Sequence, residues 1–309
     1  MRRAFSKPLP AFSRMQLKGI VAAMLEKAGD LEVAMNDDKL REQLALLPES
    51  ALVALLSDDR LAVAAESTVV AVALQWAKQR GQPTVPDAIA NCIRLKHLEP
   101  GFAAGIAHFF PQWTQRVLSL VFAGRSSPAA WQSVRGMYNA PRLLGDANER
   151  ARPGSAVVAA NFKCVLLLRD LAAVFEHSIR HRSFDMRHAL EGGAHYGGFV
   201  WLAFVAVHPA AGTSAQAGSF TVAVGVAQEV YGAPKCVGGY IDLAITVTCA
   251  GNGNCDALCE HTRGGMSVGD AFAVTGFFGF SLHAWDSKQF ARWADGAGNL
   301  NFEVEVEMQ

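Results

Sequence analysis

The pattern of hydrophobic and polar positions changes period partway along the chain. Leu and Ala recur at helical spacing over roughly the first 140 residues, whereas runs that alternate apolar and polar residues dominate after residue 155. Helices are expected at 13–28, 36–47, 49–56, 65–80, 86–92, 99–108 and 111–123. Strands are expected at 157–168, 176–186, 197–208, 219–230, 240–249, 271–280 and 300–308.

The change of period coincides with a change in glycine usage. Residues 1–150 contain 8 glycines and the remainder contains 20, which is typical of helices followed by strands and turns. The stretch GDANERARPGS, residues 145–155, is polar and interrupted by Gly and Pro, as linkers are. We therefore expect a helical domain at 1–140, a linker at 141–155 and a β domain at 156–309.

Individual residues support this α + β division. Pro48 fits the start of a helix, and Gly81 fits the position just after the end of one. Val69 and Trp76 share one face of the helix at 65–80, so that face is expected in the core. The last strand alternates apolar residues with glutamates, which predicts one buried and one solvated face. The expected fold class is a multi-domain α + β chain with antiparallel helices followed by an antiparallel β-sandwich.

Charge and hydrophobicity narrow the classes of partner. The chain has 309 residues, 51% of them hydrophobic, with 28 basic and 28 acidic side chains. A balanced charge argues against a whole-protein nucleic-acid or membrane-surface footprint, and the excess of +4 in residues 1–150 against −4 afterwards is small. No run reaches the roughly 18–20 apolar residues of a membrane helix. Neither a nucleic-acid nor a membrane partner is therefore expected, and the oligomeric state is open.

Six cysteines are too few for a disulfide scaffold and are expected to be reduced thiols of an intracellular protein. The stretch CAGNGNCDALCEH places Cys249, Cys255, Cys259 and His261 close together, and three thiols with an imidazole can bind zinc tetrahedrally. The spacing lacks the C-x₂-C pair of familiar zinc fingers. A Gly/Asn-rich loop with ordinary thiols is the favoured interpretation, and zinc is the alternative.

A basic, histidine-rich stretch follows the first expected strand. If residues 176–186 form a strand, His177 and His181 share one face and Arg180 and Arg182 the other, with His195 further along the chain. This pattern predicts a solvated basic face or, functionally, a patch that contacts an acidic peptide. No G-x-S-x-G elbow, phosphate loop or catalytic carboxylate pair is recognisable, so the expectation is a non-enzyme without cofactors.

The helical half resembles the BACK domain, which follows a BTB/POZ domain in cullin-type ubiquitin-ligase adaptors. A leucine helix leads into a Ser/Asp turn and then a Leu-x-Val-x-x-Glu step into a helix with a Trp. The residues that match are Leu52, Leu55, Leu56, Ser57-Asp58-Asp59, Leu61, Val63, Glu66, Val69 and Trp76, and CIRLKHLEPGFAAGI at 92–106 resembles the continuation. The resemblance covers about residues 20–135.

The β half is similar to the MATH/TRAF-like sandwich that ends BTB-BACK proteins of plant or green-alga type. In that family a Gly-Gly turn precedes an apolar strand, and a Phe-Gly or Trp-Gly step precedes the last loop and strand. Those places are filled by Gly192-Gly193, Phe199, Trp201, Phe278-Gly279, Phe290 and Phe302. The BTB domain that normally contacts the cullin is not recognisable in this sequence.

The two resemblances imply a non-enzymatic adaptor that recognises substrates for a cullin-RING ubiquitin ligase. A protein would bind the sandwich around Arg180, Arg182 and His195, and a cullin or a BTB-bearing partner would join. Two alternatives stay open: a metal-binding or enzymatic β domain that uses Cys255, Cys259 and His261, or a purely structural oligomerisation module. The expected location is the cytoplasm or nucleus, although the basic N-terminus has the look of a weak organelle transit peptide.

Overall fold

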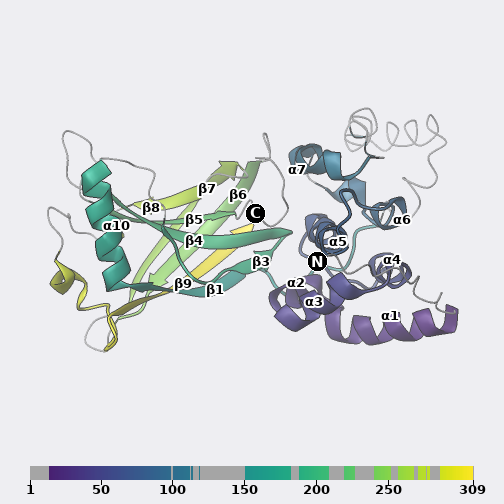
Figure 1. Cartoon of the computed structure of the whole chain (residues 1–309), viewed down its shortest axis with the longest axis horizontal. Coiled ribbons are helices and arrows are strands. Elements are labelled where there is room, and N and C mark those ends of the chain that lie inside the picture. The colour runs from purple at the N-terminus through teal and green to yellow at the C-terminus, as the bar shows by residue number, and fades with distance from the viewer. Residues whose placement is uncertain are drawn as a thin grey trace, which may run out of the picture. The chain divides into compact units, whose positions relative to one another are not determined.

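The chain divides into a helical unit, Met1–Val157, and a β unit, Val158–Gln309, and each is described by itself (Figure 1). The computed structural model describes residues 14–98, 100–111, 113, 118, 150–181, 188–208, 219–226, 240–251, 257–267, 271–275, 277–278 and 286–308. The basic N-terminal segment and most of the helix expected at 111–123 lie outside these residues. Helices in the first unit and antiparallel sheets in the second agree with the expected α + β class.

The helical unit contains six of the seven expected helices with shifted boundaries, and the seventh, at 111–123, lies mostly outside the described residues. Its elements are α1 (Arg14–Ala28), α2 (Leu31–Asn36), α3 (Asp38–Leu46), α4 (Glu49–Leu56), α5 (Glu66–Gln79), α6 (Asp87–Ala90), η1 (Leu95–His97), α7 (Pro100–Ile106) and η2 (Ala107–Phe109). The helix α2 was not expected. The break between α2 and α3 arises because the Asp37 carboxylate accepts hydrogen bonds from the backbone N–H groups of Lys39 and Leu40 and so begins a new helix.

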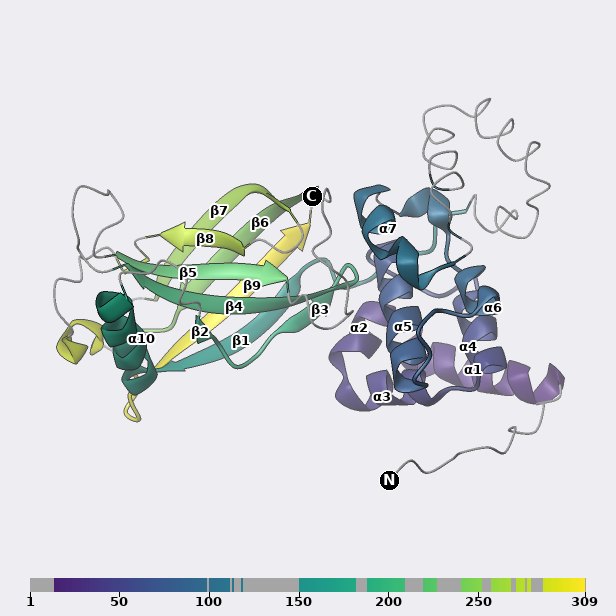
Figure 2. The same cartoon turned by 45° about the horizontal axis from the view of Figure 1, so that its top comes forward.

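The helix α5 forms the centre of the helical unit (Figure 2). Its residues are buried on almost every side, Val69 completely so, and Gly81 ends it with a φ of 65°. Trp76 packs in the core as predicted, and its indole N–H donates to the carbonyl oxygen of Leu47 at 2.7 Å. This bond ties α5 to the end of α3 and satisfies the polar atom of a buried aromatic side chain.

Residues 150–157, which begin within the predicted linker and continue two residues past it, pack on the helical unit; we call them the strap. Val63 donates its backbone N–H to Pro153 and accepts the N–H of Ser155, at 3.0 and 3.1 Å. Asp30 holds the next residues, since its carboxylate accepts the Ser155 hydroxyl and the Ala156 N–H. The same carboxylate caps α2, so one side chain both starts a helix and anchors the strap.

The β unit contains two antiparallel sheets, shown as ribbons in Figures 1 and 2. One has the order β1-β9-β6-β7, and the other the order β2-β4-β5-β8 with β3 paired to β4. The strands are β1 (Ala160–Leu167), β2 (His188–Ala189), β3 (Ala194–Tyr196), β4 (Phe199–His208), β5 (Ser219–Val226), β6 (Tyr240–Cys249), β7 (Leu258–Ser267), β8 (Ala271–Thr275) and β9 (Asn299–Met308). The predicted alternation of β9 is confirmed.

The strand expected at 176–186 is wrong over its first six residues. The chain forms a helix there, α10 (Leu168–His181), and residues 182–186 lie outside the described part. The reason is the spacing of its apolar positions, because Leu171, Val174 and Phe175 recur at three and four residues and all three are buried. The alternation of His and Arg matches the period of a strand, but it does not show which side of the segment is buried.

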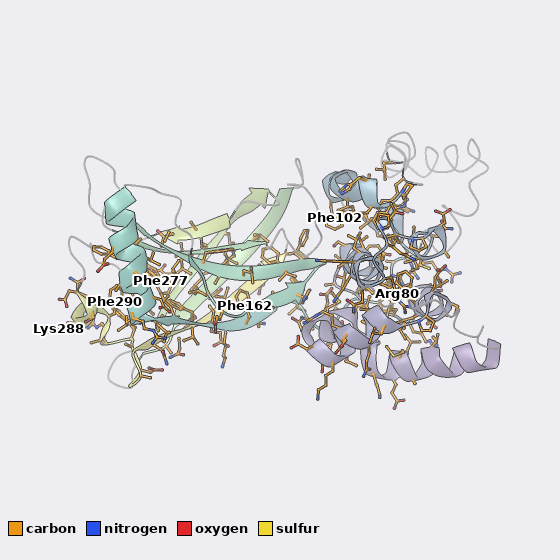
Figure 3. All side chains as sticks on the ribbon, in the orientation of Figure 1. Arg80, Phe102, Phe162, Phe277, Lys288 and Phe290 are labelled. Carbon is orange, nitrogen blue, oxygen red and sulfur yellow. The ribbon has the colours of Figure 1, made fainter. Side chains whose placement is uncertain are left out.

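Aromatic side chains gather in the core of the β unit, among them Phe277 and Phe290, which Figure 3 labels. Phe278 lies 4.8 Å from Phe220 of β5, 5.3 Å from Phe290 and 4.7 Å from Trp293, measured between ring centroids. Phe302 of β9 joins the cluster at 6.4 Å from Phe278. The cluster therefore connects strands of both sheets.

Among the described helices of either unit, none is long and apolar enough to cross a membrane.

Replacing Asp30 by Ala is expected to release the strap, because the cap of α2 and the bonds to Ser155 and Ala156 disappear together. A lost cap of this kind costs about 1–2 kcal/mol. Trypsin should then cleave the folded full-length chain faster after Arg150, as followed by mass spectrometry of the fragments. Asp38→Ala is the matched control, since that exposed carboxylate pairs with Arg41. Equal cleavage rates in both variants would contradict the role of Asp30.

Candidate functional site

The turn between α4 and α5 carries the acidic residues that the sequence singled out, and the structure shows what they bind. Glu66, at the start of α5, is buried, and its carboxylate accepts the backbone N–H of Arg94 at 2.8 Å. The same carboxylate accepts the Nε–H of Arg152 at 3.0 Å. The side chains of Glu66 and Arg152 are only 2% and 1% exposed, so this ion pair is excluded from water.

Arg152 belongs to the strap, and its Nη groups donate hydrogen bonds to backbone carbonyl oxygens. Its Nη2 donates to the carbonyl oxygen of Leu56 at 2.7 Å and to that of Cys92 at 3.0 Å, and its Nη1 donates to that of Asp58 at 3.3 Å. These carbonyls belong to the end of α4, the acidic turn and the segment after α6. One cation therefore joins three parts of the helical unit.

A second arginine completes the network at its exposed side. Arg94 donates to the Asp59 carboxylate at 2.5 Å and to the Arg150 carbonyl oxygen at 2.8 Å. Arg150 in turn lies 3.4 Å from Asp59. The acidic turn thus binds Arg94 and Arg150, although the side chains of Asp59 and Arg150 stay more than half exposed.

Burial shifts the pKa of two groups in this network, Glu66 and Arg94. It raises the pKa of Glu66 above its ordinary value, and the neighbouring charges of Arg152 and Arg94 offset that rise only in part. Burial likewise lowers the pKa of Arg94, with the charge of Arg152 acting in the same direction. Burying the Glu66 carboxylate is therefore unfavourable by itself, and the hydrogen bonds and charges of Arg152 and Arg94 offset part of that cost.

The basic strand face predicted from Arg180, Arg182 and His195 is not assembled as expected. Arg180 belongs to α10, and Arg182 lies outside the described residues. His195 is half-buried on the short strand β3, opposite Val200 of β4. In both views α10 and β3 lie at opposite ends of β4 (Figures 1 and 2). A protein-binding role for these residues stays a prediction.

In the structure, two of the four residues in the zinc hypothesis, Cys249 and Cys259, lie on different faces of a sheet. Residues 258–267 form β7, a strand that the sequence did not predict, and it pairs with β6 along its whole length. Cys249 lies opposite Leu258 and faces the core, whereas Cys259 lies opposite Thr248 on the other face. Since opposite residues share a face, Cys249 and Cys259 point to different sides of the sheet. Cys255 lies outside the described residues.

His261 shares the outer face of β7 with Cys259 and is already hydrogen-bonded. Its Nδ1 lies 3.0 Å from the Thr246 hydroxyl, and its Nε2 accepts the Nε–H of Arg263 at 3.3 Å. This arrangement assigns the hydrogen of the neutral ring to Nδ1, which donates to Thr246. Among the described residues, no three His, Cys, Asp or Glu side chains are grouped as metal ligands.

The feature of the β unit that sequence reasoning missed is the edge formed by β7. Within the part of the chain that the structure describes, β7 pairs with β6 alone, so its other side presents unpaired backbone groups. Four side chains along it are exposed: Cys259, Glu260, His261 and Arg263. The sequence LCEHTRGGMS at 258–267 lacks the apolar–polar alternation of a half-buried strand, and its two glycines and the nearby cysteines favoured a loop.

The described glycine and aromatic residues among those that carry the second resemblance are used in packing. Gly192 has a φ of 117°, and a Cβ there would meet the carbonyl oxygen of Lys163 at 2.3 Å. A Cβ on Gly193 would meet that of Trp201 at 2.6 Å. Close approach of two backbone segments explains the Gly-Gly pair, while Phe278 belongs to the aromatic core.

The comparison with protein families agrees with the first resemblance. The BACK model, described as BTB And C-terminal Kelch, matches residues 38–106, which run from the first residue of α3 to the last residue of α7. The BACK-like character of this stretch is therefore confirmed. No curated protein matches the chain. The match contains Glu66, Asp59 and Arg94 but ends well before Arg152, which completes the same network.

Replacing Arg152 by Met is expected to lower the free energy of unfolding of the helical unit by about 3–5 kcal/mol at neutral pH, because an ionised Glu66 is left buried without its partner. Burial already raises the pKa of Glu66, and losing the nearby cation raises it further. The folded state then favours protonated Glu66, so the deficit shrinks as the pH falls through that raised pKa.

Hydrogen exchange of the α5 amides in the full-length chain measures this effect across pH. Arg60→Met is the matched control, since Arg60 is exposed and pairs with Asp58, and it should leave α5 protection unchanged. If Arg152→Met lowers the protection of the α5 amides equally at every pH, or as little as the control does, the proposed coupling to Glu66 is contradicted.

Thiol labelling is expected to separate Cys259 from the buried cysteines. Cys259 is exposed, whereas Cys92, Cys164 and Cys249 are buried, and burial raises the pKa of Cys164 to about 12. Iodoacetamide at pH 8 should alkylate Cys259 in the folded protein and spare these three, as read by peptide mass spectrometry. Labelling of Cys249 at the rate of Cys259 would contradict their placement on opposite faces.

Proposed function

We propose that the chain is a non-enzymatic protein-binding adaptor, in which the helical unit is a scaffold and the β unit, as a MATH/TRAF-like sandwich, recognises the substrates of a cullin-RING ubiquitin ligase. The observation that carries the proposal is the BACK match over α3–α7 followed by a separate β unit. The description of the matched family names a BTB domain and a C-terminal Kelch domain as its companions. A β unit in this chain stands where that description has Kelch.

Two features of the structure support the division of roles. Three charged residues of the BACK-like stretch, Glu66, Asp59 and Arg94, are bound within one network that includes the strap, which suits a scaffold. The β unit instead presents the edge of β7, and an extended segment of another protein can add to such an edge through backbone hydrogen bonds. In this proposal the protein acts in the cytoplasm or nucleus and turns over no small substrate.

Co-purification of the full-length chain from cell extract, followed by cross-linking mass spectrometry, tests the proposal. We expect a cullin, held directly or through a BTB-bearing partner, together with a reproducible second protein whose cross-links fall within residues 158–309. Mass spectrometry and a cullin immunoblot identify the two.

The outcomes separate the parts of the proposal. A reproducible partner on residues 158–309 without any cullin would remove the ligase and leave a binding module. Cross-links of all partners confined to residues 14–113 would overturn the assignment of recognition to the β unit. Stoichiometric zinc in the purified protein that is lost in His261→Ala would favour the metal-binding alternative.

A further inference from the structure

The edge strand β7 carries two charges of opposite sign that the described residues leave without ionic partners. Glu260 has neither an ion pair nor a hydrogen bond with any described residue, and Arg263 has no carboxylate partner among them. Both side chains are exposed. Unpaired charges on an edge strand discourage pairing with the wrong strand, and they equally select a strand that complements them.

The two charges lie on opposite faces of the sheet. Glu260 is opposite Val247, which is buried, so it points to the core-facing side and is exposed because β7 is outermost. Arg263 is opposite Ala244 on the outer face, beside Thr246 and His261. An added strand therefore meets a negative charge on one side and, three residues further along β7, a positive charge on the other.

The guanidinium of Arg263 is held in place by its neighbour. His261 accepts the Nε–H of Arg263, and Thr246 fixes the other ring nitrogen. This leaves the two Nη groups of Arg263 available for an incoming carboxylate. A cation that is positioned before binding loses less side-chain freedom when it forms an ion pair.

A second copy of the chain cannot complement both charges. When two copies of β7 pair antiparallel about a two-fold axis, each residue lies opposite one on the same face of the continuous sheet. Glu260 and Arg263 point to different faces, so they never lie opposite each other in such a dimer. A strand from a different protein has no such constraint.

We propose that β7 binds an extended peptide segment of a partner protein, antiparallel to β7, in which an acidic residue is followed three residues later by a basic one. The acidic residue lies opposite Arg263 and the basic residue opposite Glu260, because an antiparallel strand passes Arg263 first. Antiparallel pairing continues the arrangement of every described ladder in the unit. The inference rests on the proposed function and names the class of peptide that the β unit recognises.

Fluorescence anisotropy of the full-length chain with labelled nine-residue, Thr-rich peptides tests this inference. One peptide carries acidic-x-x-basic, one carries basic-x-x-acidic, and others carry two acidic or two basic residues at the same positions. We expect the first to bind roughly three- to tenfold more tightly than the others, given the usual strength of cross-strand charge pairs. The charge-swapped variant Glu260→Arg/Arg263→Glu should reverse the preference between the first two.

The matched control is Lys163→Glu/Glu303→Lys, which swaps an exposed cross-strand pair of β1 and β9 and likewise leaves the net charge unchanged. It should keep the original preference, and circular dichroism should show that both swapped variants fold. Reversal in the β7 variant alone supports the proposal. Binding without charge preference, a better fit of basic-x-x-acidic to the unaltered chain, or reversal in the control as well overturns it.

Failure of this inference differs from failure of the proposed function. If no peptide binds while a cellular partner still cross-links to residues 158–309, the β7 inference is overturned and the adaptor stands. If no partner contacts the β unit at all, the proposed function itself fails and takes this inference with it.

Discussion

The helical unit depends on one buried ion pair, between Glu66 and Arg152. A carboxylate that is only 2% exposed at the start of the central helix is unfavourable unless a cation and hydrogen-bond donors reach it. The cation comes from 86 residues further along the chain. Its remaining donors satisfy carbonyls at the end of α4, in the acidic turn and after α6. The same interaction therefore closes the turn and fixes the strap.

Because of this ion pair, the folded helical unit extends beyond residues 38–106, which the family model matches. Residues 38–106 contain Glu66, but neither Arg152 nor Asp30 belongs to the match. The folded unit is completed from both sides, by α2 with its Asp30 cap and by the strap that the cap binds. Polar residues of the turn that look like a candidate site are accounted for by this closure. The proposed function assigns recognition of a partner to the β unit.

Several expectations held because local periodicity and burial pointed the same way. The helix α5 has a central apolar stripe and a terminal glycine, and β9 alternates over its full length. The expectations that failed were based on charged or small residues, whose order along the chain does not distinguish a helix, a strand and a loop. His and Arg in α10 alternate like a strand, yet Leu171, Val174 and Phe175 place a helical face in the core. In β7, Gly264 and Gly265 suggested a loop, while pairing with β6 imposed a strand.

The sequence by itself determined the two units, their helical and β classes, the central helix with its Trp76 core position, and the alternating last strand. These follow from local periods of about 3.6 and 2 residues, which the chain carries wherever it folds. Only the tertiary structure decided that Arg152 neutralises Glu66, that Cys249 and Cys259 face opposite sides, and that β7 is the outermost described strand of its sheet with charges on both faces. Those facts depend on which distant segments meet and in which register, and a one-residue change of register would exchange the two faces of the strand.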